Sequence, residues 1–135
     1  MPDEEQEAVG EIVAEWIRHA WQDMAVVRLV EDDEIAPEII TFHAQQAVEK
    51  ALKALLIQRQ VDFPRTHVIG VLLGLCKESG YKIDENLEEA ATLSRYAVAS
   101  RYPGETDPIT RNEAKIAGNL ATQVLNWAEN QISKE

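Results

Sequence analysis

The chain has 135 residues and a mass of 15.2 kDa, the size of one domain whose core is stable without a metal or a disulfide. Its 13 Lys and Arg against 24 Asp and Glu give a formal charge of −11, so we do not expect the general surface to bind RNA or an anionic membrane. One cysteine, no secretory signal and no long apolar run lead us to expect a cytoplasmic protein.

The charge is concentrated at one end of the chain. Residues 1–39 contain 12 acidic residues against two arginines, a balance of −10, and we expect the acidic start at 1–9 to fray. Residues 40–82 contain six Lys and Arg against three acids, a balance of +3. A local phosphate site in residues 40–82 is therefore compatible with the acidic net charge of the chain.

Apolar residues recur at intervals of three and four, the period of an α-helix, in the first half of the chain. Those from Val9 to Val27 predict a helix over residues 5–30. Pro37 suits the first turn of a second helix, over 37–60, because its missing amide would have no partner there.

A third helix is predicted over 67–78, with Thr66 as N-cap and Gly80 as a left-handed residue after its end. Gly70 and Gly74, four residues apart, are expected to let another helix approach closely.

Two further helices follow. Asp84 predicts the start of one over 85–102, which the Pro103-Gly104 turn ends. Thr110 and Glu113 have the spacing of a capping box, which predicts a last helix to about residue 132.

No segment has the alternation of a strand, so we predict an all-α, single-domain fold over 1–135, an up-and-down bundle of about five helices. Its core should include Trp16, Leu55, Leu72, Leu93 and Leu120.

The helix over 37–60 has two distinct faces. Alanines gather with Leu55 on one side, while polar residues gather opposite. Phe42 falls on the polar side, where it either packs under the first helix or marks a ligand or self-association surface. Our candidate interface residues are Phe42, Gln45, Gln46 and Glu49.

Three segments of the chain resemble the prokaryotic HEPN domain family, over roughly residues 10–130. They are Phe42-His43-Ala44-Gln45-Gln46-Ala47-Val48-Glu49-Lys50-Ala51-Leu52-Lys53-Ala54-Leu55-Leu56, Pro64-Arg65-Thr66-His67 and Arg101-Tyr102-Pro103-Gly104. The resemblance implies a HEPN-like bundle of four or five helices, a homodimer, pairing with a minimal nucleotidyltransferase, and a nucleotide or RNA ligand.

Many members of that family are metal-independent ribonucleases in which an arginine is followed, after four to six residues, by a histidine. No arginine of this chain has histidine at that spacing, and Arg101 is followed there by Thr106, Asp107 and Pro108. We therefore assign no catalytic residue.

The remaining candidates for a phosphate site lie at the expected start of the third helix and before the Pro103-Gly104 turn. They are Arg65, Thr66, His67, Lys53, Arg101 and Tyr102. The alternative is that Thr66 only caps, His67 packs on a neighbouring helix, Arg65 is solvated, and Arg101 and Tyr102 have structural roles.

Other chemistry is not indicated. The histidines lack metal-site spacing, so we expect no metal and no cofactor, and Cys76 lies on an apolar stripe as a buried thiol.

We therefore predict a non-catalytic HEPN-type module, a homodimer that binds a nucleotide, a minimal nucleotidyltransferase, or both. One alternative is a toxin-like ribonuclease in which Arg101 meets His43 or His67 through folding. A second is a protein-interaction adaptor whose acidic first helix docks on a basic partner.

Overall fold

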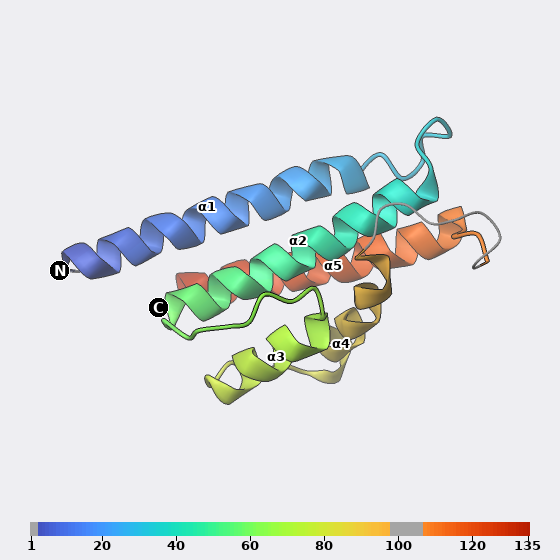
Figure 1. Cartoon of the computed structure of the whole chain (residues 1–135). Coiled ribbons are helices and arrows are strands. Elements are labelled where there is room, and N and C mark those ends of the chain that lie inside the picture. Colours follow the sequence, from blue (N-terminus) through green and yellow to red (C-terminus); the bar gives the residue numbers. More distant parts are fainter. Residues whose placement is uncertain (1–2, 98–106) are drawn as a thin grey trace.

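The computed structural model describes residues 3–97 and 107–135, and all regular secondary structure within them is helical. In chain order the elements are α1 (Glu4–Val27), α2 (Pro37–Gln58), α3 (Ile69–Glu78), α4 (Glu85–Glu88), the 3-10 helix η1 (Glu89–Tyr96) and α5 (Arg111–Ser133) (Figure 1). The predicted all-α fold is confirmed. Arg101, Tyr102 and the Pro103-Gly104 turn lie outside the described residues.

Local capping explains where most helices begin. The Asp3 side chain accepts a hydrogen bond from the Gln6 amide at 2.8 Å, and the Gln6 side chain accepts one from the Asp3 amide at 3.2 Å. This capping box stabilises the start of α1 at Glu4, so residues 4–9 are helical in the structure. Thr110 caps α5 and Asp84 caps α4, both as predicted. The segment predicted as one helix over 85–102 is instead the four-residue α4 followed by the 3-10 helix η1, which ends at Tyr96.

The third helix begins two residues later than predicted. Its N-cap is Val68, and the Thr66 hydroxyl accepts a hydrogen bond from the Val68 amide at 3.0 Å, in a turn that precedes the helix. The prediction of Thr66 as N-cap is therefore wrong. Gly80, after the end of α3, has a φ of +103°, the left-handed conformation that was predicted.

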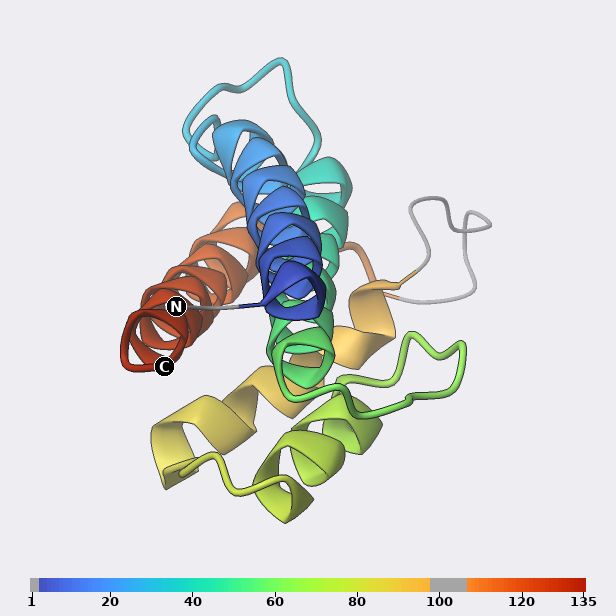
Figure 2. The same ribbon diagram turned by 90° about the vertical axis from the view of Figure 1, so that its left-hand side faces the viewer.

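α2 is the central helix of the molecule. It contacts α1, α5, α3 and η1, and the end-on view shows α1 above it, α5 to one side, and α3 with α4 below (Figure 1, Figure 2). α1 runs antiparallel to α2, whereas α5 runs in the same direction as α2 (Figure 1). The short elements between α2 and α5 return the chain to the end at which α2 begins. Coverage from several sides accounts for the many buried residues of α2.

The core joins all the helices. Leu55, Leu72 and Leu93 are buried as predicted, at 0, 0 and 1% exposure. Leu120 and Trp16 are only half-buried. Leu120 packs against the edge of the core, whereas Trp16 lies on a groove between α1 and α2. Predicting Trp16 as a core residue was therefore wrong, because its position on α1 faces the border of α2 rather than its centre.

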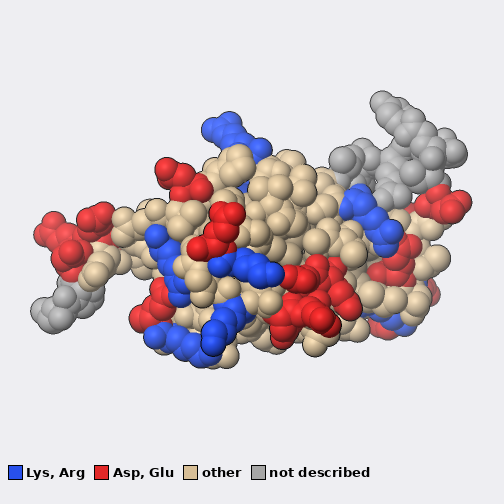
Figure 3. Space-filling view, turned by 90° about the horizontal axis from the view of Figure 1, so that it is seen from below, with Lys and Arg blue, Asp and Glu red and all other residues tan. Residues whose placement is uncertain are grey.

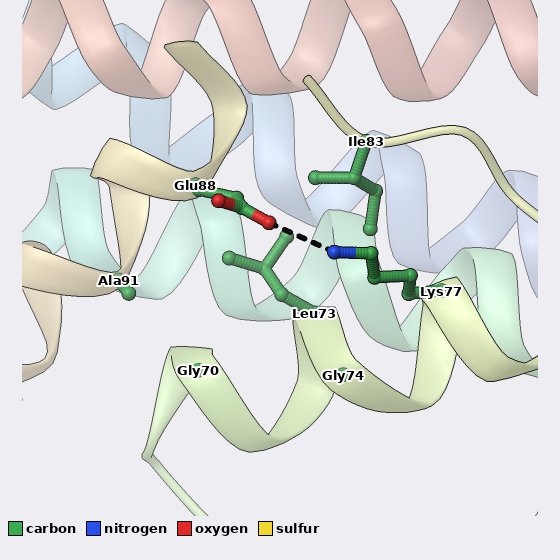
Figure 4. A pocket seen from close by; sticks show the side chains of 7 residues that line it. All are labelled: Gly70, Leu73, Gly74, Lys77, Ile83, Glu88 and Ala91. Carbon is green, nitrogen blue, oxygen red and sulfur yellow. Dashed lines mark hydrogen bonds and ion pairs between the residues drawn. The ribbon is translucent and has the colours of Figure 1, made fainter. Parts of the chain in front are cut away.

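Among the described residues, no neighbour comes so close to α3 that its two glycines are required. A Cβ on Gly74 would meet nothing within 4 Å, and one on Gly70 would meet only Ala91 at the ordinary distance of 3.9 Å. Figure 4 shows both glycines on a shallow pocket of about 290 Å³ between α3 and η1, across which Lys77 pairs with Glu88 at 3.1 Å. The close approach occurs instead at Gly118 of α5, where a Cβ would lie 2.9 Å from Val27 Cγ1.

The surface charge follows the sequence. Seen from below, acidic side chains mark the projecting end where α1 begins, and basic and acidic side chains are mixed over the rest of that face (Figure 3). Among the described residues, no helix combines the length and the apolar character needed to cross a membrane.

Candidate functional site

One face of α2 is left uncovered by α1 and α5. Phe42, Gln46 and Lys53, which share a side of the helix, are half-buried there. On the α1 side, this face borders a groove of about 340 Å³ lined by Glu15, Trp16, His19 and Lys50. On its other side lies the segment 59–68 (Figure 2). Two clusters of charged side chains flank the face.

The first cluster, the Asp23 cluster, joins α1 to α2. The Asp23 carboxylate accepts a hydrogen bond from Lys50 Nζ at 2.7 Å, and its other oxygen lies 2.9 Å from His43 Nδ1. The Asp23 side chain is 10% exposed and the His43 side chain 30%. A carboxylate accepts hydrogen bonds, so Nδ1 of His43 carries the proton and Nε2 is the nitrogen left to accept one.

The second cluster, the Glu49 cluster, consists of Gln45, Glu49, Lys53 and His67. The Glu49 carboxylate accepts hydrogen bonds from Lys53 Nζ at 2.7 Å and from Gln45 Nε2 at 2.8 Å, and His67 Nδ1 lies 3.1 Å away. The Gln45 amide also donates to the His67 carbonyl at 3.2 Å. These bonds fasten the segment before α3 onto α2.

The electrostatics of Glu49 follow from these bonds. Burial favours the neutral form of the carboxyl, but the hydrogen bonds from Lys53, His67 and Gln45 outweigh it and hold the pKa of Glu49 below its ordinary value of 4.5. The carboxylate therefore stays ionised at neutral pH although Glu49 is only 4% exposed.

Lys53 lies between two aromatic rings. Its Nζ is 6.0 Å from the centre of the Trp16 ring and 5.8 Å from that of Phe63. Both rings attract the ammonium group through their faces, and the contacts add to the ion pair with Glu49. Cations and aromatic rings thus meet beside the exposed imidazole of His67, whose side chain is 67% exposed.

Backbone amides at the start of α3 are already hydrogen-bonded and are not available to bind a phosphate. The Ile69 amide donates to the Ser94 hydroxyl at 2.8 Å, and the Val68 amide donates to Thr66. Arg65 is exposed. Of the residues predicted for a phosphate site, the structure brings Lys53 and His67 together at Glu49, leaves Arg65 and Thr66 on the adjoining turn, and does not describe Arg101 and Tyr102.

The candidate interface residues separate into two pairs. Phe42 and Gln46 are half-buried on the uncovered face, and the Phe42 ring meets the edge of His43 with centres 5.3 Å apart. Gln45 and Glu49 are 0 and 4% exposed inside the chain, so the expectation that they lie on an exposed surface is wrong. The helical periodicity separates polar from apolar sides, but the segment 59–68 covers one flank of the polar side.

Three residues of this region escaped the sequence argument for the site. Asp23 and Lys50 lie 27 residues apart and meet only in the fold. Phe63, in the connection between α2 and α3, was not among the predicted site residues. The usable signal was the acidic Asp23 near the buried end of an amphipathic helix, since a buried carboxylate requires a partner. In the part of the chain that is described, no group of three or more His, Cys, Asp or Glu side chains is placed to hold a metal ion.

Comparison with known sequences gives a family. A family model described as the HEPN domain matches residues 13–131. The chain is 31% identical over 96 residues to "Putative toxin MJ1304" of Methanocaldococcus jannaschii, a match covering 65% of this chain and 61% of that protein. The chain thus spans less than two thirds of the length of this curated relative.

Two solved structures share the fold. TT1696 from Thermus thermophilus is 30% identical with a TM-score of 0.75, and the match covers 87% of this chain and 96% of that one. ST0689, described as an archaeal HEPN homologue, is 32% identical with a TM-score of 0.69, and the match covers 89% of this chain and 97% of that one.

Proposed function

Because the chain belongs to the HEPN domain family and lacks the arginine-to-histidine spacing of that family's ribonucleases, we propose that it is a non-catalytic helical binding module. Its ligand on this proposal is a nucleotide, held on the uncovered face of α2 beside the Glu49 cluster. The observation that carries the proposal is the meeting of Lys53, two aromatic rings and the exposed His67 at one place.

The chemistry of this place suits a nucleotide of modest affinity. A base has a flat face that stacks on an aromatic ring, and Trp16 and Phe63 offer two such rings. Arg65 is exposed and can meet a phosphate, as can Nε2 of His67, because His67 contacts Glu49 through its other ring nitrogen, Nδ1. The ammonium group of Lys53 is paired with Glu49 at 2.7 Å. With one or two cations available, we expect a Kd of about 1 mM rather than a nanomolar one.

An NMR titration of isotope-labelled protein with AMP or ATP tests the proposal. We expect amide shifts over residues 63–69 and at the indole of Trp16, and at least a threefold weaker Kd for Arg65→Ala, because a charge-assisted contact to phosphate is lost. Lys82→Ala is the matched control, an exposed cation outside the site. The absence of shifts at about 10 mM nucleotide, or equal weakening in both variants, contradicts the proposal.

The partners belong to the same proposal. We propose a homodimer and an association with a minimal nucleotidyltransferase, the partners that the family resemblance implies. The uncovered Phe42 and Gln46 support a contact through α2.

A second candidate, a toxin-like ribonuclease, is favoured by the Asp23 cluster. His43 is oriented by a carboxylate on Nδ1, as in general bases, and its Nε2 is left to accept a proton. The similarity to a relative named as a toxin also supports this candidate. Against it, Lys50, the cation that shares the Asp23 carboxylate with His43, is bonded to that carboxylate at 2.7 Å and is not free to bind a phosphate.

Incubation with labelled RNA without metal separates the two candidates. A binding module leaves the RNA intact. Cleavage that is lost in His43→Ala but retained in His19→Ala would establish the ribonuclease and refute the non-catalytic proposal. His19 is the matched control, since it is exposed and its carboxylate partner is Glu15 at 3.4 Å.

A further inference from the structure

The first part of α1 is helical although almost none of its residues is buried against the rest of the chain. Every residue from Glu4 to Ile12 is exposed except Val9, which is half-buried, and the first buried residue is Val13. This end of α1 projects beyond the end of α2 (Figure 1). A short projecting helix gains little stability from the burial of apolar surface. Its helical conformation can be stabilised by a capping box and by contact with a partner.

Four carboxylates form a ridge along this part of α1. Glu4, Glu7, Glu11 and Glu15 follow one another at spacings of three and four, so they share one side of the helix. In the described part of the chain, Glu4, Glu7 and Glu11 form no ion pair, and only Glu15 is paired, with the neighbouring side chains of Arg18 and His19. Like charges at these spacings repel one another, and a partner's cations would relieve that repulsion.

Apolar groups lie beside the ridge. Ile12 is 49% exposed, and one turn later Trp16 lines the groove of about 340 Å³ shared with Glu15, His19 and Lys50. By helical spacing, Ile12 and Trp16 occupy the side of α1 between the ridge and the core. A row of negative charge next to an apolar strip is the complement of a basic amphipathic helix.

We propose that the ridge and the strip of Ile12 and Trp16 form a docking surface for a basic amphipathic helix of a partner protein. The proposal extends the binding role proposed above by assigning a protein partner to α1, on a surface that shares Trp16 with the nucleotide site. Charge complementarity selects this occupant: a nucleic acid would be repelled by the ridge, and a second copy of this chain docked here symmetrically would bring its own acidic ridge to the contact.

A synthetic helical peptide tests the surface. The probe has lysine or arginine at every fourth position on one side and leucine beside them, over about 16 residues, the length that matches the ridge and its flanks. Binding to the whole chain is followed by fluorescence anisotropy of labelled peptide, with NMR shifts locating the contact. We expect shifts on α1 from residue 4 to 19 and an affinity that falls steeply with salt.

Two matched pairs of variants decide the outcome. The double variant Glu7→Lys/Glu11→Lys should weaken binding about tenfold or more, while Glu78→Lys/Glu89→Lys, with the same change of charge on exposed residues of α3 and η1, should stay within about twofold. Ile12→Gln should weaken binding about threefold, while Val71→Gln, at 42% exposure on α3, should not. All four are surface changes whose folding circular dichroism can verify.

Equal weakening in the two double variants, shifts centred on α3 or α5, or no binding at low salt would overturn the proposal. Because both surfaces include Trp16, the nucleotide titration on the same samples is read at residues 63–69 and the peptide titration at residues 4–12, which belong to one proposal each. Nucleotide binding without peptide binding refutes only the docking surface, and peptide binding on α1 without nucleotide binding refutes only the nucleotide site.

Discussion

Glu49 joins α2 to the segment before α3, and hydrogen bonds from its partners offset the free-energy cost of burying its charge. Its carboxylate is buried, and three hydrogen-bond donors from α2 and from the segment before α3 surround it. A buried ion with this set of partners is tolerated, whereas the loss of one member leaves the others desolvated and unpaired. The remaining oxygen of Gln45, Oε1, is buried with no hydrogen-bond partner among the described residues.

Glu49→Gln should lower the free energy of unfolding by about 2–3 kcal/mol at pH 7, because Lys53 loses its counter-charge while it stays largely buried. The pKa of Glu49 is lowered in the folded chain, so its stabilisation is complete above the ordinary value of 4.5 and is lost as the pH falls through the folded pKa. The difference between wild type and variant should therefore shrink below about pH 4.5.

Urea denaturation at pH 7, 5 and 3 measures this difference. Glu78→Gln, an exposed carboxyl on α3, is the control and should cost little at any of these pH values. A difference for Glu49→Gln that is independent of pH would show that the charge of Glu49 is not what stabilises the cluster.

At the scale of elements, the distance between helices is set at particular small residues. α1 and α5 approach each other at Gly118, where Val27 of α1 occupies the space that a side chain would need. α3 carries its two glycines on the side that faces the shallow pocket, where no helix of the described chain lies against Gly74. The same residue type thus has opposite consequences in the two helices.

Gly118→Ala and Gly74→Ala should shift stability in opposite directions. At Gly74 the new methyl group meets no atom, so the gain in helix propensity should raise the free energy of unfolding by about 0.5–1 kcal/mol. At Gly118 the methyl group would lie 2.9 Å from the stiff, buried side chain of Val27, and overpacking should outweigh the same gain, for a net loss of about 1–2 kcal/mol.

Thermal and urea denaturation of the two variants check this pair. A Gly118→Ala protein as stable as Gly74→Ala would mean that α1 and α5 adjust their separation without loss.

At the scale of the whole molecule, the uncovered face of α2 is where we propose that a second copy of the chain packs. Phe42 is half-buried there although it is a large apolar residue, and its only ring contact among the described residues is the edge of His43. The acidic ridge of α1 lies on a different element, so a dimer through α2 would not bring the two ridges into the contact.

Phe42→Asp should convert a dimer into a monomer, because a charge buried in an apolar contact costs about 2–4 kcal/mol. Sedimentation at micromolar concentration measures the change. Val71→Asp, on an exposed position of α3, is the control that should leave the dimer intact. A wild-type chain that sediments as a monomer, or a dimer that survives Phe42→Asp, removes this interface.

Much of the fold was predictable because its signals are local. α2 begins at Pro37, which has no amide hydrogen that would need a partner in the first turn. α4 and α5 begin after Asp84 and Thr110, whose side chains each accept a hydrogen bond from the amide three residues later. The site was less predictable, because Asp23 pairs with groups 20 and 27 residues away. Lys53 and His67 were predicted as site residues, but the carboxylate between them was assigned to an interface.

The sequence by itself determined the helical class, the uneven charge and the absence of the ribonuclease spacing, since each depends on residue identity and on spacing along the chain. Only the tertiary structure decided that Gln45 and Glu49 are internal, that Trp16 borders a groove, and that Asp23 orients His43. Helical periodicity states which residues share a side of a helix, but what covers that side depends on how distant segments pack, and no local interaction encodes that packing.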